Sequence, residues 1–440
     1  MLAMTLVACL LVCMGAMVSS CDSKEEKPDY DLAALAEAVE KYDNIDSFHD
    51  GLAVVRIGDY ETGKRGFINK QGELVVPCKY DWAWDFSDGL ARVKIGDKWG
   101  FVNKKGEEVI TCKYDGAEDF SDGLAQVWID DKCGFVNKEG EEVIPLKYDW
   151  AYDFSDGLAR VKIGDDGTGK CGFVNKKGEE VVPCKYGWTE SFSEGLAPVM
   201  IGDDETGKWG FVNKEGEEVI PIKYDRADSF SEGLARVRVG GYYTGKCGFV
   251  NKEGEEVIPL KYDDAGPFSD GLAPVMIGDD ETGKWGFINK EGEEVIPLKY
   301  DGGGTFFEGL APVLIDGKCG FINKKGELVV ACKYDFVLSV SDGMILVLIG
   351  DWETGKWGFV NKEGEEVVPC KYDDAHDFSD GLARVELDGK YGFVNKKGEG
   401  VVPCKYDRAE EFSDGLARVK IGDKWGFVDK EGNDTFSVSR

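Results

Sequence analysis

One motif recurs along nearly the whole chain and constrains its fold more than any other feature. A Gly-Phe pair followed by Val or Ile and then by Asn or Asp occurs eleven times in the 440 residues. Neighbouring copies lie 34 or 38 residues apart, as between Gly66 and Gly100 or between Gly134 and Gly172. A fixed period of this size is typical of proteins that stack one supersecondary unit many times. The sequence therefore predicts a single repeat array over residues 41–440.

Each repeat contains three segments with the pattern of a β-strand. In the unit that begins at Phe86, residues 90–95 alternate apolar and polar side chains, which predicts a half-buried strand. Residues 98–103 and 108–114 continue the pattern, and a glycine turn separates them. Residues 115–120 place Ala and Phe three apart, which predicts a single helical turn as a crossover. The fold class expected is all-β, built from three-stranded antiparallel meanders.

The number of units and a recurrent proline predict how the meanders are arranged. Eight units carry Pro at the same point of the third strand, as at Pro183, and this predicts a sheet edge or a bulge there. The longer units differ by a four-residue insertion at one point, which marks a loop. Closed propellers usually have about 4–8 blades, so eleven units predict an open, superhelical, solenoid-like array rather than a closed propeller.

The N-terminal segment predicts export and a lipid anchor. Residues 1–20 are apolar and uncharged, as in a signal peptide, and Val18-Ser19-Ser20-Cys21 resembles a bacterial lipobox with Cys21 as the lipid attachment site. The segment has no basic residue, so a retained membrane anchor stays an alternative. Residues 21–30 form a charged tether, in which Lys24-Glu25-Glu26 resembles the surface-export signal of Bacteroidetes lipoproteins; a plain linker is equally compatible. These features predict a lipid-anchored protein of the cell envelope, in the outer membrane, with surface exposure left open.

A short helix is expected between the tether and the repeats. In residues 31–44 the apolar side chains recur at the spacing of one amphipathic helix, with Asp31 as its N-cap. Terminal repeats need a cover for their apolar end, and this helix is placed to supply it.

The composition argues against several classes of function. The chain has 84 acidic and 53 basic residues, a formal charge of -31, so we expect no nucleic acid partner. Only two histidines, His49 and His376, are present, which argues against His-based catalysis and His-ligated metals. The acidic loops, such as residues 203–207, lack the ligand spacing of an EF-hand and resemble hairpin tips. We therefore predict no catalytic residue, no metal, no cofactor and no enzymatic activity.

The repeat sequence itself resembles a known family. The run Lys-Trp-Gly-Phe-Val-Asn-Lys-Glu-Gly-Glu-Glu-Val-Ile-Pro stands at residues 208–221, and nearly the same run begins at Lys284. It resembles the WG (KWG) β-repeat of bacterial envelope and secreted proteins. The resemblance implies an extracytoplasmic β-repeat scaffold with no agreed activity and no catalytic residues. The motif tryptophan is present in five units and replaced by Arg65, cysteine or tyrosine in the others, which indicates a tolerant packing site.

Ten cysteines lie in the repeat region. Six of them occupy a third-strand position where other units carry Leu or Ile, so we expect buried free thiols. Disulfides between Cys171 and Cys184, and between Cys319 and Cys332, stay an alternative that depends on the turn between their strands.

The residues that differ between repeats are the candidates for binding. Early crossovers carry large aromatic residues, namely Trp82, Trp84, Trp150, Tyr152 and Trp188. Equivalent positions of an array fall along one face, so these rings are expected to form a stripe suited to sugar rings or to a protein partner. The alternative is that they pack between neighbouring units.

These observations predict a non-enzymatic envelope lipoprotein that touches the membrane only through its lipid and offers an extended surface to a protein or a glycan. A passive spacer or self-associating surface protein is the alternative. A glycan-processing enzyme with paired carboxylates is a weaker one.

Overall fold

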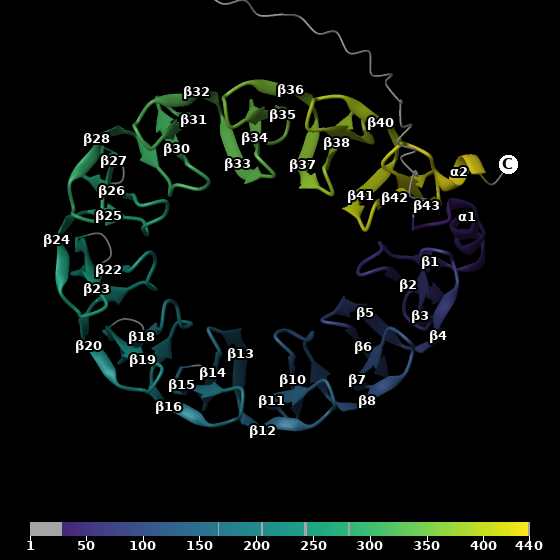
Figure 1. The fold of residues 1–440 in the computed structure, drawn as a ribbon, viewed down its shortest axis with the longest axis horizontal. Coiled ribbons are helices and arrows are strands. Elements are labelled where there is room, and N and C mark those ends of the chain that lie inside the picture. The colour runs from purple at the N-terminus through teal and green to yellow at the C-terminus, as the bar shows by residue number, and fades with distance from the viewer. Residues whose placement is uncertain (1–28, 166, 204–205, 242–243, 280–281, 439–440) are drawn as a thin grey trace, which may run out of the picture.

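The protein is a closed ring of eleven small β-sheets arranged as the blades of a propeller (Figure 1). The structure is a computed structural model that describes residues 29–165, 167–203, 206–241, 244–279 and 282–438. Ten blades have four antiparallel strands, and the last has three. The prediction of an all-β repeat protein is confirmed, but the predictions of an open solenoid and of three-stranded meanders are wrong.

Within each blade the strands follow one another from the centre of the ring to its rim (Figure 1). The innermost strands of blades 1 to 11 are β1 (Asn44–Ile45), β5 (Trp82–Ser87), β9 (Gly116–Ala117), β13 (Trp150–Ser155), β17 (Trp188–Thr189), β21 (Arg226–Ala227), β25 (Asp264–Ala265), β29 (Gly302–Gly303), β33 (Phe336–Ser341), β37 (Asp374–Ser379) and β41 (Arg408–Ser413). The second strands are β2 (Leu52–Ile57), β6 (Leu90–Ile95), β10 (Leu124–Ile129), β14 (Leu158–Ile163), β18 (Leu196–Ile201), β22 (Leu234–Val239), β26 (Ala273–Ile277), β30 (Leu310–Ile315), β34 (Met344–Ile349), β38 (Leu382–Leu387) and β42 (Leu416–Ile421).

The outer half of each blade carries the recurrent Gly-Phe motif, and in eight blades it also carries the proline. The third strands are β3 (Lys64–Asn69), β7 (Lys98–Asn103), β11 (Lys132–Asn137), β15 (Lys170–Asn175), β19 (Lys208–Asn213), β23 (Lys246–Asn251), β27 (Lys284–Ile288), β31 (Lys318–Asn323), β35 (Lys356–Asn361), β39 (Lys390–Asn395) and β43 (Lys424–Asp429). The rim strands are β4 (Leu74–Tyr80), β8 (Glu108–Tyr114), β12 (Glu142–Tyr148), β16 (Glu180–Tyr186), β20 (Glu218–Tyr224), β24 (Glu256–Tyr262), β28 (Glu294–Tyr300), β32 (Leu328–Tyr334), β36 (Glu366–Tyr372) and β40 (Gly400–Tyr406).

The expected crossover turn is in fact the innermost strand, and a bulge explains the error. In β5 the register shifts between Ala83, which pairs with Val93, and Phe86, which pairs with Ala91. A bulge adds one residue to a strand, so two residues three apart can face the same side. Ala83 and Phe86 are both buried for this reason. Their spacing therefore imitated a helical turn.

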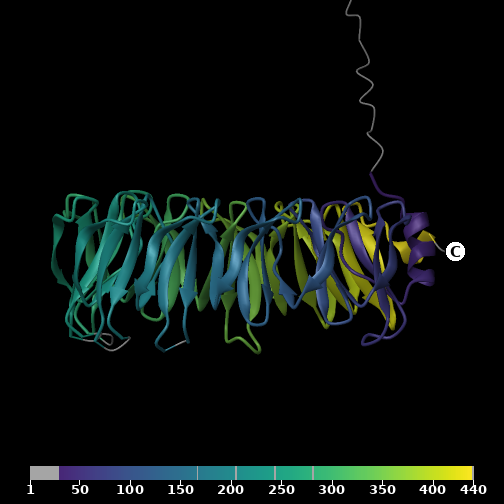
Figure 2. The same cartoon turned by 90° about the horizontal axis from the view of Figure 1, so that it is seen from below.

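The rim strand lies at a sheet edge and is bulged, as its proline predicted. The register of β15 and β16 shifts between Cys171, which pairs with Tyr186, and Phe173, which pairs with Val182. Pro183 lies within this irregular stretch and so interrupts no regular ladder. All ten cysteines of the repeats are free thiols. The four-residue insertions extend the hairpins between second and third strands, which lie on one face of the ring (Figure 2).

The apolar core lies between blades and not within one central region. Each cluster of buried residues joins two neighbouring blades, as where Phe101 and Tyr114 of blade 2 pack with Phe120 of blade 3. At ten of the eleven interfaces a phenylalanine of the third strand meets a phenylalanine of the next blade, and the rings of Phe101 and Phe120 are 4.8 Å apart. Phe321 meets Val340 instead. The blades therefore pack against their nearest neighbours, without one global core.

Ionic contacts repeat at the same interfaces. A lysine that begins the third strand of one blade reaches the aspartate that precedes the next innermost strand, as in the pair Lys98 and Asp115 at 2.5 Å. The other carboxylate oxygen of Asp115 accepts from the backbone N–H of Asp130. These contacts fix the angle between neighbouring blades. The nine pairs are Lys64–Asp81, Lys98–Asp115, Lys132–Asp149, Lys208–Asp225, Lys246–Asp263, Lys284–Asp301, Lys318–Asp335, Lys356–Asp373 and Lys390–Asp407.

The last blade closes the ring on the first with the contacts used elsewhere. The backbone N–H of Gly51 donates to Asp414 at 2.6 Å, just as Gly123 donates to Asp88 at 2.9 Å between blades 2 and 3. A ring closes when the rotation from one blade to the next equals a full turn divided by the number of blades. A smaller rotation per blade therefore gives a ring with more blades. The repeat motif does not specify that rotation. The prediction relied instead on the usual range of about 4–8 blades, and this ring lies outside that range.

Two short helices cover the outer side of the join. Helix α1 (Leu32–Lys41) begins at the N-cap Asp31, whose carboxylate accepts from the backbone N–H groups of Ala33 and Ala34, which confirms the predicted cap. Leu35 is fully buried in the cluster that joins blades 11 and 1. Helix α2 (Thr435–Val438) stands where a fourth strand of blade 11 would begin. No helix among the described residues is long and apolar enough to cross a membrane.

Candidate functional site

The residues that vary between repeats line the inner side of the ring. The innermost strand presents its first and third residues, Trp82 and Trp84 in blade 2, next to the fifth residue of the second strand of the preceding blade. Main-chain pairing fixes the backbone here, whereas the side chains are free to differ. Among the described residues, three pockets lie between neighbouring blades beside their innermost strands. Together they contain all five aromatic residues expected from the sequence.

The first of these, the Trp84 pocket, lies between blades 1 and 2 and reaches blade 11. It has a volume of about 560 Å³ and includes Tyr60, Trp82, Trp84, Asp85 and Glu410. The Trp82 ring meets Tyr60 edge-on at 5.6 Å and Trp84 at 6.2 Å. Trp84 is 46% exposed, which leaves an indole face open to a ligand.

Carboxylates occupy the wall of the Trp84 pocket nearest the join. Asp85 lies 3.7 Å from the imidazole of His49. Burial, countered by His49 and reinforced by the negative charges of nearby carboxylates, raises the pKa of Asp85. Glu410 accepts from the Ser47 hydroxyl at 2.6 Å and pairs with Arg418 at 2.7 Å. This wall therefore presents oxygen acceptors of the kind that bind hydroxyl groups.

Guanidinium groups also line the Trp84 pocket. The guanidinium of Arg65 lies 3.9 Å from the centre of the Trp82 ring. Arg65 is buried and donates to the main-chain oxygens of Asp81 and, at 2.9 Å, of Tyr60. Burial first, and then the charge of Arg56, lower the pKa of Arg65. The pocket thus combines an aromatic surface with carboxylate acceptors and guanidinium groups.

The Trp150 pocket lies between blades 3 and 4 and is the largest of the three, at about 740 Å³. Trp150 is 51% exposed, and Tyr152 carries the guanidinium of Arg160 3.7 Å above its ring. The third aromatic residue, Trp128, pairs with Gly116 across the sheet. A Cβ atom at Gly116 would come within 1.9 Å of the indole, so only glycine leaves room for this ring.

The Trp188 pocket lies between blades 5 and 6 and has a volume of about 600 Å³. The indole N–H of Trp188 donates to Glu190 at 2.9 Å. Trp209, the tryptophan of the family motif in this blade, lies in the same pocket together with Arg226 and Asp228. Here the motif tryptophan contributes to a pocket as well as to packing.

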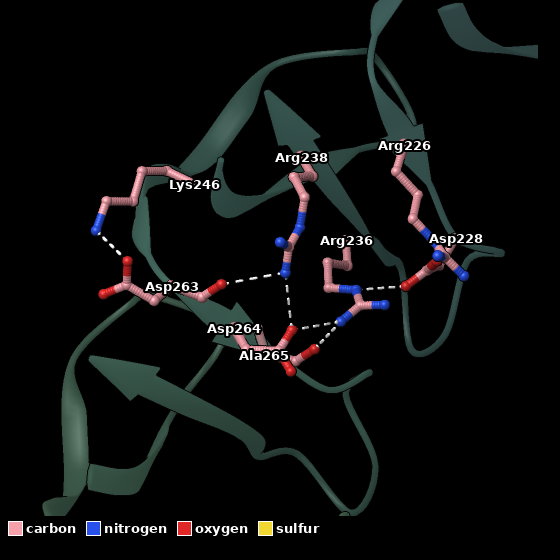
Figure 3. Close-up of polar contacts among 8 residues, drawn as sticks. All are labelled: Arg226, Asp228, Arg236, Arg238, Lys246, Asp263, Asp264 and Ala265. Atoms are coloured by element: carbon pink, nitrogen blue, oxygen red, sulfur yellow. Dashed lines mark hydrogen bonds and ion pairs between the residues drawn. The ribbon is translucent and has the colours of Figure 1, made fainter. Parts of the chain in front are cut away.

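Between blades 6 and 7 the innermost strands carry no aromatic residue, and ion pairs occupy the equivalent place (Figure 3). Arg238 donates to Asp264 Oδ1 and to the main-chain oxygen of Asp263, both at 3.1 Å. Arg236 pairs with Asp228 of its own blade and also reaches Asp264 at 3.1 Å. Each cation has a carboxylate beside it, so this interface is electrostatically satisfied.

The five predicted residues do not form one continuous stripe. Trp82 with Trp84, Trp150 with Tyr152, and Trp188 alone belong to three separate pockets. Trp84, Trp150 and Tyr152 are exposed, whereas Trp82 and Trp188 are half-buried. The expected stripe is therefore wrong in its continuity, and the packing alternative describes part of Trp82 and Trp188.

Sequence analysis missed Arg56, Tyr60 and Trp128. Arg56 and Trp128 share one repeat position, the fifth residue of the second strand, which varies as freely as the crossover. Comparing that position across all units would have found them. Cys21, the predicted lipid attachment site, lies outside the described residues, as do the signal peptide (1–20) and nearly all of the tether (21–30). In the acidic loop at Asp203 the carboxylate accepts from the backbone N–H and the hydroxyl of Thr206, as in a hairpin tip.

The repeat assignment agrees with a comparison to known families. The signature of the WG-containing repeat matches residues 38–60, 66–99, 99–133, 134–165, 172–203, 209–243, 248–279, 285–319, 320–351, 357–391 and 391–425. The chain belongs to this family. WG repeats here are thus the blades of a propeller, and each matched segment after the first spans the outer part of one blade and the inner strands of the next. No curated protein sequence matches the chain significantly.

Solved structures with similar stretches are distant. A eukaryotic initiation factor is 13% identical with a TM-score of 0.42, covering 69% of this chain and 92% of that one. The tricorn protease is 10% identical with a TM-score of 0.26, covering 89% of this chain and 53% of that one. An acylaminoacyl peptidase of Pyrococcus horikoshii is 10% identical with a TM-score of 0.31, covering 64% and 57%.

Proposed function

We propose that this WG-repeat propeller is a non-enzymatic binding protein of the cell envelope that holds a glycan on its inner side. The observation that carries the proposal is the set of three pockets in which aromatic rings lie beside carboxylates. Sugar rings stack their C–H faces on exposed indoles, and their hydroxyl groups donate to carboxylate oxygens. Trp84 and Trp150 supply the exposed rings, and Asp85 and Glu118 are acceptors in the same pockets.

The spacing of the pockets favours a chain over a single small molecule. The three pockets fall at blades 1–2, 3–4 and 5–6, all on one half of the ring. Several weak sites on one rigid scaffold strengthen binding to a repeating polymer, because the later contacts form at a high effective concentration. A short ligand would gain nothing from the second and third pockets.

The absence of enzymatic activity is part of the proposal. Carboxylates lie beside aromatic rings in all three pockets, and we assign them to hydrogen bonds with ligand hydroxyl groups rather than to catalysis. The lipid anchor at Cys21 and the envelope location also belong to the proposal, and they rest on the sequence of residues 1–30. A passive spacer remains the alternative, and it predicts no ligand for the pockets.

Two experiments test the proposal. The protein without residues 1–28 is applied to a glycan array beside the variant Trp84→Ala/Trp150→Ala, with Trp352→Ala as a control on an exposed tryptophan outside these pockets. We expect glycans that bind the parent and the control but not the double variant. Proteinase treatment of intact cells, followed by mass spectrometry, then tests the location. Repeat peptides released without lysis place the array outside the cell, and peptides released only after lysis place it in the periplasm.

A further inference from the structure

Arg56 of blade 1 and Arg238 of blade 6 occupy the same place in their blades. Both are the fifth residue of the second strand, in β2 (Leu52–Ile57) and β22 (Leu234–Val239). Both pair with the first residue of the innermost strand, Arg56 with Asn44 and Arg238 with Arg226. The two guanidinium groups therefore leave equivalent points of the ring, toward the following blade.

The residue at the start of the next blade's innermost strand differs between the two places. Asp264, the first residue of β25, gives Arg238 a carboxylate at 3.1 Å (Figure 3). The equivalent residue of blade 2 is Trp82, which offers a ring and no charge. Among the described residues Arg56 has no ion pair, and its Nη1 atom is buried without a hydrogen-bond partner. A buried guanidinium nitrogen without an acceptor costs free energy that a ligand can recover.

A second cation, Arg65, lines the same pocket and adds to its positive charge. Arg65 stands where most blades have Trp or Cys, and its nitrogens are occupied by main-chain oxygens. Asp46 accepts from Asn44 at 2.6 Å and lies 3.9 Å from Arg418. Asp59 accepts from Thr62 in the hairpin beyond. The space beside Arg56 thus has positive charge that no described carboxylate neutralises at ion-pair distance.

We infer that the Trp84 pocket selects a saccharide unit that carries a carboxylate, a hexuronic acid, whose carboxylate binds Arg56 as Asp264 binds Arg238. This inference rests on the proposed function. The sugar ring stacks on Trp84, and its hydroxyl groups meet Asp85 and Glu410. A carboxylate can accept two parallel hydrogen bonds from a planar guanidinium group. We therefore expect the pocket to prefer a sugar acid over an uncharged sugar.

The test uses two ligands that differ only at their carboxyl groups, which are ionised in one and methyl-esterified in the other. Trigalacturonate and its fully methyl-esterified form are titrated into the protein by calorimetry at about 0.15 M salt, where the field of the acidic ring is screened beyond roughly 8 Å. We expect the acid to bind at least about tenfold more tightly than the ester, as is typical of a charge-assisted hydrogen bond. Arg56→Gln should remove that preference, so that acid and ester bind with equal affinity.

Arg408→Gln is the matched control, because it removes one exposed cation at the start of β41, outside the Trp84 pocket. The acid preference should survive in this variant. Equal binding of acid and ester by the parent protein overturns the inference but leaves the proposed function standing. A preference that survives Arg56→Gln also overturns it. If the parent protein binds neither trisaccharide, the inference fails, and the proposed function fails with it only if the glycan array is also blank.

Discussion

The ring of Phe427 lies 5.3 Å from that of Phe48, so the last blade of the chain packs against the first. The same pair of positions is occupied by Phe211 and Phe230 in mid-ring, at 5.0 Å. The join therefore uses the same packing as nine other interfaces, but no described strand passes across it. Propellers that close in this way depend on side chains and on the covering helix α1 at that point.

Removal of the join's aromatic contact should open the ring. We expect Phe427→Ala to lower the free energy of unfolding by about 3–5 kcal/mol, because a buried phenylalanine leaves a cavity. We also expect a larger radius of gyration in X-ray scattering, since only this interface lacks a chain connection. Phe211→Ala is the control; it should lose similar stability without expanding. An unchanged radius in Phe427→Ala would show that the helices alone hold the ring closed.

The lysine–aspartate pairs between blades should make stability depend on acidity. The ammonium of Lys208, together with the backbone N–H of Gly240, lowers the pKa of Asp225 below its ordinary value. A lowered folded-state pKa contributes stability above the unfolded pKa, about 3.9 for aspartate, and loses it as the pH falls through the folded value. We expect guanidinium midpoints that are steady from pH 7 to about pH 5 and fall below about pH 4.

The variant Asp225→Asn isolates one such pair. It should be less stable than the parent at pH 7 and converge toward it near pH 2, because the parent then loses the same charge. Asp97→Asn, at an exposed turn, is the control and should track the parent at every pH. Parallel curves for Asp225→Asn and the parent would contradict the role given to the pair.

Gly116→Ala should damage the Trp150 pocket specifically. The added methyl group would meet the indole of Trp128 at 1.9 Å and displace it. We expect a loss of about 1–3 kcal/mol in the free energy of unfolding, as for an overpacked site, and a changed tryptophan emission. Gly302→Ala is the matched control, at the same place in blade 8, where Leu314 leaves 3.1 Å. Equal effects of the two substitutions would contradict the close fit of Trp128.

The thiols should resist alkylation while the protein is folded. Burial raises the pKa of Cys112 and Cys133 to about 11 and that of Cys184 to about 12, so the reactive thiolate is scarce at pH 8. We expect iodoacetamide to modify these three residues only after unfolding in guanidinium, as read by mass spectrometry. Modification at equal rates in folded and unfolded protein would contradict their burial.

Most of the blade could be predicted from the sequence, because its strands obey simple patterns. Residues 90–95 alternate, Gly106 supplies the positive φ of its turn, and Pro183 marks a bulged edge. The innermost strand was missed because a bulge between Ala83 and Phe86 hid its alternation. Closure was missed for a different reason: it depends on the rotation between blades, which no single repeat encodes.

The residues of the candidate site could likewise be predicted only in part from the sequence. Trp84 and Trp150 could be selected because they vary within a regular repeat and are large and aromatic. Arg56 could not be selected by residue type alone, since Arg238 at the same position has a carboxylate partner and Arg56 does not. Such a difference appears only when residues of two neighbouring blades are placed together.

The most direct test of the account is a calorimetric titration of a glycan that binds the parent protein into the variant Trp84→Ala/Trp150→Ala. Loss of each exposed ring should weaken binding by about 0.5–1.5 kcal/mol, on the scale of a single aromatic stacking contact. The account predicts a combined loss of about fivefold or more in affinity with unchanged thermal stability, and no loss in Trp352→Ala. Equal affinity of the parent and the double variant would show that the glycan binds elsewhere and would contradict the account.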